Sequence, residues 1–352
     1  MTRLRVLIVA SEAPPLVSGV AKSIGEIADG LIARGHEVVV LSSAEARGVR
    51  WDRIRFSTLM AQVGAVIEND GPFDIINIHG PAPSISDLAL LRFTKRNRGA
   101  KIVYTHHFSL HFGKWSADVL GRLYEMFFRR VAKKCDGIVT TTKDYAVPFE
   151  RHGMTVAVIP WGFDEARFFP GEREYSGEGP LRVLAVGQFR RYKGMAVAVR
   201  AVVGHPDLDL TLVGQGPVLS SVLQQIPVTS TNVRHYGRVA DDGLGQMMRE
   251  HDVILLPSRT RAEAFGIVLL EGMASGCVPV ASSLPGVREV VGSVGLTTRP
   301  GDELSLRKAL QSLARNPEEV ARLRKDAVER ASSYTWERTV DAYEALFQRL
   351  VR

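Results

Sequence analysis

Short, almost uninterrupted apolar runs alternate with longer amphipathic stretches along the whole chain. The runs are rich in Val, Ile and Leu, which is typical of parallel strands buried on both faces of a sheet. They predict one series of strands at 5–10, 37–42, 74–79, 101–107, 137–142 and 156–160, and a second at 181–187, 208–214, 233–237, 253–258, 278–283 and 294–298. Most gaps have room for a helix, so the pattern predicts βαβα repetition and doubly wound α/β sheets.

A segment rich in Gly, Pro and Glu at 168–180 separates the two series near the middle of the chain. It predicts an N-terminal Rossmann-like domain at 1–167, a linker at 168–180, and a C-terminal Rossmann-like domain at 181–335. A last helix within 336–352 closes the chain, and its return to the N-terminal domain is left open. Two such domains are expected to face a central cleft, with ligands beyond the carboxyl ends of the strands.

Composition places the chain among ordinary globular proteins. Hydrophobic residues make up 45% and charged residues 24%, which excludes wholesale disorder and fibrous architecture. Cys135 and Cys277 are too few for a disulfide scaffold and form no zinc motif, which favours a reducing compartment. The first apolar run ends at Ser11, too short for a signal peptide, and no run reaches the roughly 20 residues of a membrane span. We therefore expect a cytoplasmic protein.

The charge is concentrated in one window. The whole chain is net +7, whereas the window from Arg92 to Lys134 alone is net +9. Its basic residues are Arg92, Lys95, Arg96, Arg98, Lys101, Lys114, Arg122, Arg129, Arg130, Lys133 and Lys134. On a helix, Leu123, Phe127 and Val131 would form one stripe, with Arg122, Arg129 and Lys133 near the opposite side. Two explanations stay open: a helix lying on an anionic membrane at the inner face, or an ordinary helix with its apolar stripe on the sheet.

The segment 257–276 carries the clearest chemistry. A strand ends at Ser258, a loop with Arg259 and Arg261 follows, and a helix is predicted to begin near Gly266. Unpaired N–H groups at a helix start suit a phosphate, and Gly266 would let a ligand approach the backbone. Glu263 and Glu271 are eight residues apart, so they would share a face on a continuous helix. Because Glu263 precedes the expected helix start, it can point into the cleft while Glu271 comes up from the second turn. The alternative is a pair of surface carboxylates.

This segment resembles the E-x7-E motif of retaining GT-B glycosyltransferases, specifically glycosyltransferase family 4, the group 1 glycosyl transferases. The resemblance extends over nearly the whole chain. It includes Val186–Gly194 for G-R-L…K-G, Gly214-Gln215-Gly216-Pro217 for G-x-G-P, Gly237-Arg238-Val239 for G-x-V, Gly276–Val280 for G-x-P-V and Gly286–Glu289 for G-x-x-E.

The resemblance implies a sugar-nucleotide donor, UDP- or GDP-linked, bound mainly by the C-terminal domain. Lys193 would neutralise the diphosphate that leaves as an anion, and Glu271 would accept hydrogen bonds from the ribose. Glu263 would contact the transferred sugar near its reacting carbon. The full set of expected donor-binding residues is Gly19, Arg190, Arg191, Lys193, Gly216, Val239, Phe265, Gly266, Ile267, Val268 and Glu271.

One position departs from the family. Gln188 stands where the family usually has Arg, and Gln brings no positive charge to a diphosphate. Arg190 or Arg191 from the same loop would have to substitute.

The N-terminal domain would bind the acceptor. Gly19, in Ser18-Gly19 where family members often have Gly-Gly, would offer its amide to the donor phosphate. The family carries a histidine at the end of the fourth strand, and the register assigns it to His107, which would hydrogen-bond the transferred sugar. His106 would point to the other face by strand alternation. His79 and His111 are weaker candidates.

No metal is expected. Too few ligand-type side chains gather in the sequence for a metal site. Asp207 and Asp209 form a D-x-D pair, the metal-nucleotide signature of another glycosyltransferase fold. They stand at the beginning of a strand, away from the ligand-binding edge, so we interpret them as solvated. Neither a cofactor nor a metal is therefore predicted beside the nucleotide-sugar co-substrate.

Rival functions are weaker. For an α-glucan phosphorylase or synthase the chain is short and lacks a cofactor lysine motif. A nucleic-acid binder would need a recognisable motif in the basic window, and none is present. A two-lobed sugar receptor needs no paired glutamates. The sugar, the nucleobase and the acceptor, whether saccharide, lipid or small molecule, stay open, and retention follows from the resemblance alone.

Overall fold

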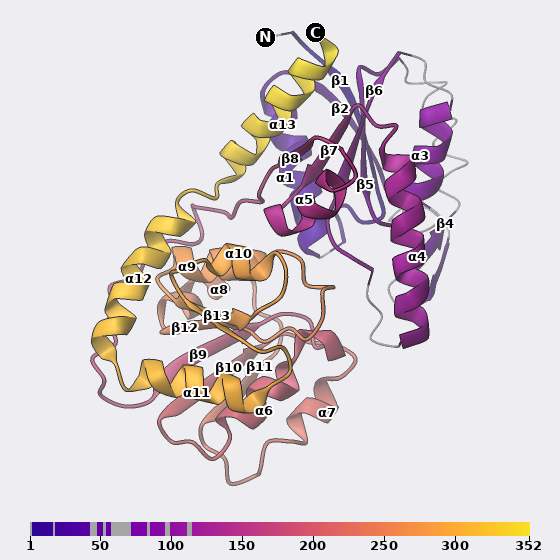
Figure 1. The fold of residues 1–352 in the computed structure, drawn as a ribbon. Coiled ribbons are helices and arrows are strands. Elements are labelled where there is room, and N and C mark those ends of the chain that lie inside the picture. The colour runs from indigo at the N-terminus through magenta and orange to yellow at the C-terminus, as the bar shows by residue number, and fades with distance from the viewer. Residues whose placement is uncertain are drawn as a thin grey trace. The chain divides into compact units, whose positions relative to one another are not determined.

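The computed structural model of the protein describes residues 2–16, 18–42, 48–51, 54–57, 72–82, 85–95, 99–110 and 115–352. The chain forms two compact units, unit 1 with Met1–Gly162 and Trp336–Arg352, and unit 2 with Phe163–Thr335 (Figure 1). Each unit is built on a six-stranded sheet in which all neighbouring strands are parallel. The prediction of two doubly wound sheets is confirmed.

The sheet of unit 1 has the order β2-β1-β5-β6-β7-β8. The strands are β1 (Arg5–Ala10), β2 (Glu37–Ser42), β5 (Ile75–Gly80), β6 (Lys101–His106), β7 (Gly137–Thr140) and β8 (Val156–Val158). Alternate residues of β1 enter two cores: Val6 and Ile8 face one, Leu7 and Val9 the other. This two-sided burial explains the uninterrupted apolar runs in the sequence.

Helices cover both faces of this sheet. They are α1 (Gly19–Ala33), α3 (Ser86–Lys95), α4 (Trp115–Ala132), α5 (Lys143–Glu150) and α13 (Trp336–Val351). α1 and α13 supply one core, whereas α3, α4 and α5 supply the other. An antiparallel hairpin of β3 (Gly48–Trp51) and β4 (Ile54–Ser57) lies between β2 and β5 in the chain, and the sequence pattern did not predict it.

The sheet of unit 2 has the order β11-β10-β9-β12-β13-β14. The strands are β9 (Leu181–Val186), β10 (Leu208–Val213), β11 (Val233–Tyr236), β12 (Val253–Leu256), β13 (Val278–Ser282) and β14 (Leu296–Thr298). The helices are η1 (Arg191–Lys193), α6 (Met195–Val202), α7 (Leu219–Leu223), α8 (Asp241–Arg249), α9 (Ile267–Ala274), α10 (Val287–Val291), α11 (Glu303–Ala314) and α12 (Pro317–Ala331). The strand order reverses direction between β9 and β12, which makes this pair the switch point of the sheet.

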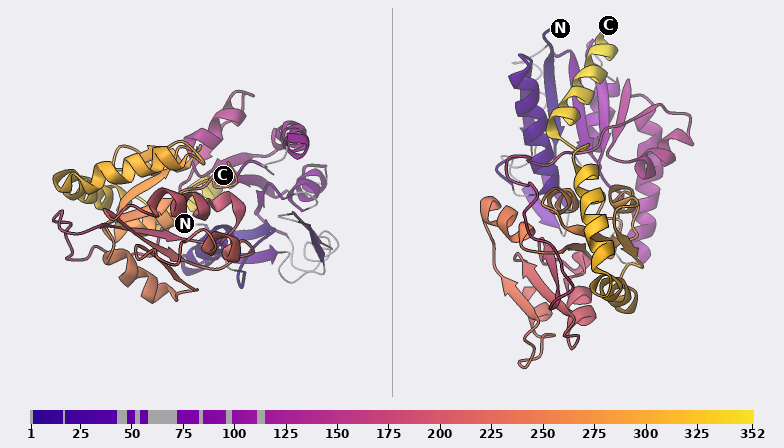
Figure 2. Two further views of the ribbon diagram at one scale, coloured as in Figure 1. Left: turned by 90° about the horizontal axis from the view of Figure 1, so that it is seen from below. Right: turned by 90° about the vertical axis from the view of Figure 1, so that its left-hand side faces the viewer.

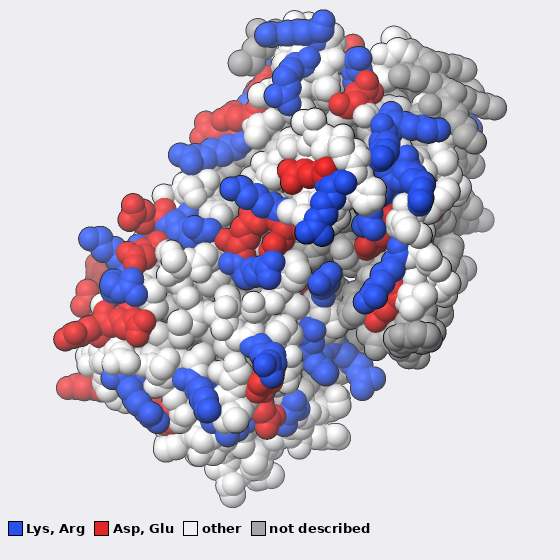
Figure 3. Space-filling model, in the orientation of Figure 1, with Lys and Arg blue, Asp and Glu red and all other residues white. Residues whose placement is uncertain are grey.

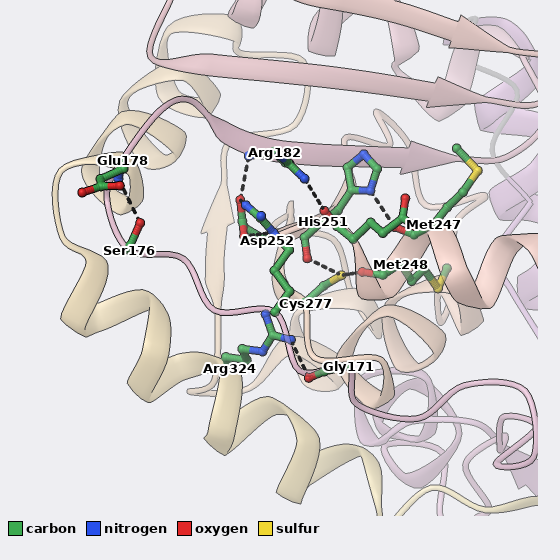
Figure 4. A network of polar contacts seen from close by, with 12 residues as sticks. Gly171, Ser176, Glu178, Arg182, Met247, Met248, His251, Asp252, Cys277 and Arg324 are labelled. Carbon is green, nitrogen blue, oxygen red and sulfur yellow. Dashed lines mark hydrogen bonds and ion pairs between the residues drawn. The ribbon is translucent and has the colours of Figure 1, made fainter.

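The predicted linker 168–180 belongs to unit 2 and is fixed to it. The Arg173 guanidinium pairs with the buried Asp252 carboxylate at 3.3 Å. Arg324 donates to the Gly171 carbonyl at 3.2 Å (Figure 4). The Tyr175 hydroxyl donates to the carbonyl of Ala314 at 2.9 Å. The units divide between Gly162 and Phe163 instead, because Gly and Pro mark irregular backbone and not freedom from packing.

Helix α13 packs against α1 in unit 1, so the last helix returns to the N-terminal part of the chain (Figure 2). A Cβ atom at Gly30 would lie 2.5 Å from Val340 Cγ2, so the two helices approach closely there. At the helix margin, Arg34 pairs with Asp341 at 2.5 Å and His36 with Glu344 at 3.0 Å. These contacts join the two ends of the sequence into one core.

Candidate active site

Two loops meet at the switch point of unit 2. Lys193 follows β9, Glu263 follows β12, and Lys193 Nζ lies 2.6 Å from Glu263 Oε2. Ser258 Oγ donates to the same carboxylate oxygen at 3.1 Å. Glu263 is 8% exposed, so this carboxylate is held between a cation and a hydroxyl out of bulk water. The structure thus brings together two residues that the sequence placed 70 positions apart.

The loop after β9 is fixed onto the loop after β12. Arg259 N donates to the Tyr192 carbonyl at 2.6 Å, immediately before Lys193. Gly194 has φ +73°, and a Cβ there would lie 1.9 Å from the Pro257 carbonyl oxygen. Because a side chain would force the loops apart, Gly194 is required for Lys193 to reach Glu263.

Helix α9 begins at Ile267 after Gly266, whose φ is +81°. A Cβ at Gly266 would lie 2.6 Å from Leu256 Cδ2, and one at Gly272 would lie 2.5 Å from the Ile254 Cβ. Glycine at 266 therefore has a local reason, the left-handed turn that packs α9 on β12, in addition to the ligand approach expected from the sequence. Leu269 N donates to the Gly266 carbonyl at 2.8 Å, and the amides before Leu269 precede the first intrahelical hydrogen bond, as at any helix start.

The remaining predicted donor residues of unit 2 differ in exposure. Phe265 is 1% exposed and its ring contacts Tyr334, so only its backbone is available to a ligand. Glu271 and Ile267 are also buried, whereas Val268 and Val239 are half-buried. Glu271 lies within α9 and Glu263 precedes it, as expected for a helix that begins near Gly266.

Gly216 serves the packing of two adjacent loops. A Cβ there would lie 2.6 Å from the Phe189 carbonyl oxygen, and Phe189 N donates to the Gln215 carbonyl at 2.9 Å. This contact ties the loop after β10 to the loop after β9. The G-x-G-P motif thus supports the loop that carries Lys193.

Gln188 and Arg190 are joined in this loop. Arg190 Nε donates to Gln188 Oε1 at 2.8 Å. Arg190 is half-buried, whereas Arg191 is exposed. The residue that replaces the usual arginine therefore holds the guanidinium of a neighbour.

The D-x-D pair lies at the opposite end of the sheet from these loops. Asp209 pairs with Arg234 at 2.6 Å, and Asp207 accepts a hydrogen bond from Gln311 at 3.1 Å. Both stand where β10 begins, while Lys193 and Glu263 follow the ends of β9 and β12. Within the described ranges, no group of three or more His, Cys, Asp or Glu side chains is arranged to hold a metal ion.

Unit 1 gathers a buried polar cluster on β5 and β6. His79 Nδ1 lies 2.9 Å from His107 Nε2, and Asn77 Nδ2 lies 2.9 Å from His79 Nε2. His107 is 1% exposed, and its ring contacts Trp161 at a centroid distance of 5.2 Å. Burial lowers the pKa of His107 to about 3, so the imidazole is neutral near pH 7.

His106 occupies the other face of the strand. The Tyr104 hydroxyl lies 3.1 Å from His106 Nδ1, and Phe149 packs edge-on to the ring. Burial first, and then the charges on His107 and Arg129, lower the pKa of His106 to about 3. His106 and His107 thus have different neighbours, as strand alternation predicts.

Gly19 is the exposed first residue of α1, and the start of this helix is already capped. Ser18 Oγ accepts from Ala21 N at 3.0 Å and donates to the Glu12 carboxylate. The sequence did not single out Glu12. Its carboxylate brings a negative charge to the helix start at which a phosphate was expected.

Helix α4 presents its apolar residues differently from the expected stripe. Phe128 and Val131 pack into the core, whereas Leu123 is 51% and Phe127 52% exposed. The prediction that Leu123, Phe127 and Val131 face one way is therefore wrong. The core stripe is rotated by one residue, and periodicity does not distinguish two apolar stripes on one helix.

The exposed stripe of α4 lies among cations. It consists of Leu120, Leu123, Met126 and Phe127. Arg122, Arg130, Lys133 and Lys134 are exposed on or directly after the same helix. Lys and Arg side chains gather over the end of α4 at the right of Figure 3. Arg129 differs, since it is half-buried and pairs with Glu125 at 3.7 Å.

Several predicted residues lie outside the described residues. These are His111, Lys114, Arg96 and Arg98, and the side chain of Lys95 is likewise not described. Across the described part of the chain, no helix is long and apolar enough to cross a membrane.

Sequence reasoning missed the supporting side chains of both clusters. Ser258 was visible only as the end of a strand, Thr105 only as the start of the T-x-H pattern that sets the register of His107, and Asn77 and Tyr343 gave no motif at all. The one available signal was polarity: Asn77 and Thr105 interrupt the apolar runs of β5 and β6. A buried polar residue inside such a run needs a hydrogen-bond partner.

Comparisons with known proteins cover both units. Residues 172–330 match the family described as glycosyl transferases group 1, and residues 17–167 match glycosyltransferase family 4. A phosphatidyl-myo-inositol mannosyltransferase of Mycobacterium tuberculosis is 30% identical over 307 residues, which cover 79% of this chain and 78% of that protein.

Solved structures share the architecture. Sucrose-phosphate synthase from Thermosynechococcus elongatus superposes with a TM-score of 0.80 at 18% identity, and the match covers 99% of both chains. Anabaena HepE in complex with UDP has a TM-score of 0.72 at 18% identity, covering 98% of this chain and 100% of that one. At these identities the likeness concerns the fold.

Proposed function

This chain belongs to the group 1 glycosyl transferases of glycosyltransferase family 4, with the GT-B fold, and we propose that it moves a sugar from a UDP- or GDP-linked donor to a saccharide or lipid-linked acceptor with retention of the anomeric configuration. It is accordingly a hexosyltransferase-type glycosyltransferase. The observation that carries the proposal is the pairing of Lys193 with Glu263 at the switch point of unit 2.

The proposed roles follow from the chemistry of these side chains. Lys193 leaves its pairing with Glu263 when a diphosphate arrives, and stabilises the charge that develops on the leaving group. Glu263 then faces the transferred sugar near its reacting carbon. The amides from Phe265 to Val268 and the start of α9 contribute fixed partial positive charge, so no metal is needed.

Glu271 accepts hydrogen bonds from the ribose, and Arg190 supplies the positive charge that the neutral side chain of Gln188 cannot bring to the diphosphate. Gln188 holds the Arg190 guanidinium at 2.8 Å, which favours Arg190 over the exposed Arg191. In unit 1, His107 donates to the transferred sugar, and Gly19 contributes less than expected because Ser18 and Glu12 occupy the helix start.

The test is nucleotide titration by calorimetry. Lys193→Ala should raise the Kd for UDP or GDP about ten- to a hundredfold, the effect of one charge-assisted hydrogen bond, and Glu271→Ala should weaken binding similarly. Arg200→Ala is the matched control, because Arg200 pairs with Glu303 on the surface of the same unit. Wild-type affinity in both site variants would show the donor assignment to be wrong.

The acceptor is proposed to be met at an anionic membrane surface. The mannosyltransferase relative is named for phosphatidyl-myo-inositol, and α4 combines an exposed apolar stripe with exposed cations. A helix of this kind lies in the interface plane, with its apolar face among lipid chains and its cations at anionic headgroups. Under the alternative, a small soluble acceptor, the stripe would have no such role.

A further inference from the structure

A continuous chain of buried hydrogen bonds in unit 1 ends at His107. The hydroxyl of Tyr343 on α13 lies 3.3 Å from Thr105 Oγ1, which donates to Asn77 Oδ1 at 2.9 Å. Asn77 Nδ2 lies 2.9 Å from His79 Nε2, and His79 Nδ1 lies 2.9 Å from His107 Nε2. All five side chains are buried, so their polar hydrogens need acceptors in the protein and not in bulk water.

Asn77 sets the direction of this chain. In the orientation of its amide, Oδ1 accepts from Thr105 and Nδ2 faces His79 Nε2. The amide nitrogen can only donate, so in this orientation His79 Nε2 accepts. Burial, and then the charge on His107, lower the pKa of His79, so the ring is neutral and carries one N–H. That hydrogen is therefore on Nδ1, from which it is donated to His107 Nε2.

The hydrogen-bonding pattern at Tyr343 disfavours a chain in which donors and acceptors are reversed. If Thr105 donated to Tyr343, the phenol hydrogen would need another acceptor, and no described residue other than Thr105 bonds to this hydroxyl. Burial raises the pKa of Tyr343, so the hydrogen is present near neutral pH. With Tyr343 as the first donor, each hydrogen bond of the chain as far as His107 has one donor and one acceptor.

The remaining nitrogen of His107 is where the chain ends. Nδ1 is buried, and none of the described residues offers it a hydrogen bond. We propose that Tyr343, Thr105, Asn77 and His79 hold His107 as its Nδ1–H tautomer, and that this N–H is presented to an acceptor oxygen of the transferred sugar. Asn77 and His79 are thus positioning residues, which act through His107. The identity of the ligand rests on the proposed function, whereas the tautomer does not.

The tautomer is measurable without any ligand. Protein labelled with 15N-histidine gives long-range proton–nitrogen correlations that distinguish a protonated from an unprotonated ring nitrogen. The signals of His107 are assigned by their loss in His107→Gln. We expect a protonated Nδ1 and an unprotonated, hydrogen-bonded Nε2 in the full-length protein at pH 7. Protonation at Nε2 would overturn the proposal.

Variants of His79 test the positioning. His79→Leu removes the donor to His107 Nε2, so both tautomers should appear and kcat should fall about two- to tenfold, the effect of one neutral hydrogen bond. His79→Gln keeps an N–H donor and should restore the single tautomer. Tyr104→Phe is the control, since it removes the bond to His106 on the other face and should leave the His107 signals unchanged. A single tautomer in His79→Leu contradicts the positioning role.

Adding the donor sugar separates this inference from the proposed function. A shift of the His107 Nδ1–H signal on addition of UDP- or GDP-sugar, absent with UDP or GDP alone, supports the sugar contact. If His107 is the Nδ1–H tautomer and its signal does not shift, the chain of hydrogen bonds is supported and the contact with the transferred sugar is contradicted. If the donor binds but His107 is the Nε2–H tautomer, the proposed function is supported and the role of the hydrogen-bond chain is contradicted.

Discussion

Glu263 is held by two partners of different chemistry, the Lys193 ammonium and the Ser258 hydroxyl. Replacing it with Gln keeps its shape and removes its charge. We expect kcat to fall about a hundredfold, the effect of losing one electrostatic contact at the reacting centre. The Kd of the donor should change much less, because Lys193 is then free to meet the diphosphate. Steady-state kinetics with parallel titration separates the two quantities.

Ser258→Ala is the companion to this experiment, since it removes one hydrogen bond from Glu263 and leaves the ion pair. It should lower kcat less than Glu263→Gln does. Equal turnover in wild type and Glu263→Gln would show that Glu263 has no role in the reaction.

Asp207 and Asp209 give a further prediction at the level of single residues, which concerns the need for a metal ion. Each has its own partner, Gln311 and Arg234, at the start of β10. Activity should therefore survive EDTA, and Asp209→Asn should keep wild-type turnover. Loss of activity in EDTA that manganese restores would favour the D-x-D pair and contradict the metal-independent mechanism.

At the scale of elements, the packing of α1 on α13 joins residues from both ends of the chain. Gly30→Ala would place a methyl group 2.5 Å from Val340 Cγ2. We expect a loss of about 1–3 kcal/mol in the free energy of unfolding, as overpacking costs. Val340→Ala combined with Gly30→Ala should recover part of it, because the clash disappears. Urea denaturation of the four proteins of this cycle measures the coupling, and additive losses would contradict the contact.

Helix α4 carries the membrane prediction. The protein should sediment with anionic vesicles at low salt and not with neutral ones. Arg130→Gln with Lys133→Gln should weaken vesicle binding by about 1 kcal/mol per residue. Leu123→Gln with Phe127→Gln should also weaken it, whereas Val228→Gln, an equally simple change at a fully exposed apolar residue of unit 2, should not.

Absence of binding to anionic vesicles would remove the membrane proposal and leave the glycosyltransferase assignment intact. Binding that survives the loss of both Leu123 and Phe127 would point to charge alone. The two pairs of variants thus separate the apolar stripe from the cations.

At the scale of the whole molecule, the reaction has a stereochemical outcome. We predict that the product keeps the anomeric configuration of the donor, with Glu263 and His107 as the residues whose replacement lowers turnover. NMR of the anomeric proton of the product decides this once a donor has been found. Thermal shift with a panel of nucleotide sugars finds it, because a ligand that binds the native state stabilises it by mass action. An inverted linkage would contradict the retaining mechanism.

The fold, and the place of the candidate site after the ends of the strands, could be predicted from the sequence. Two-sided burial turns a central parallel strand into an apolar run, so the predicted strand 5–10 coincides with β1. The half-buried edge strand β2 coincides with the predicted 37–42 because it carries a similar apolar run. The hairpin of β3 and β4 escaped, because a short antiparallel pair leaves no such run. The loop after β9 and the start of α9 were identifiable because glycines and charges stand at fixed offsets from strand ends.

What only the tertiary structure decided depends on contacts between distant residues. The family resemblance predicts that Lys193 meets a phosphate and that Glu263 meets a sugar. Only the tertiary structure shows that their side chains pair at 2.6 Å. Likewise, which stripe of α4 faces the core was settled by packing, since both stripes have the same period. The partners of His107 come from β5, β6 and α13, and no local pattern records such a chain because each of its hydrogen bonds joins side chains brought together by the sheet.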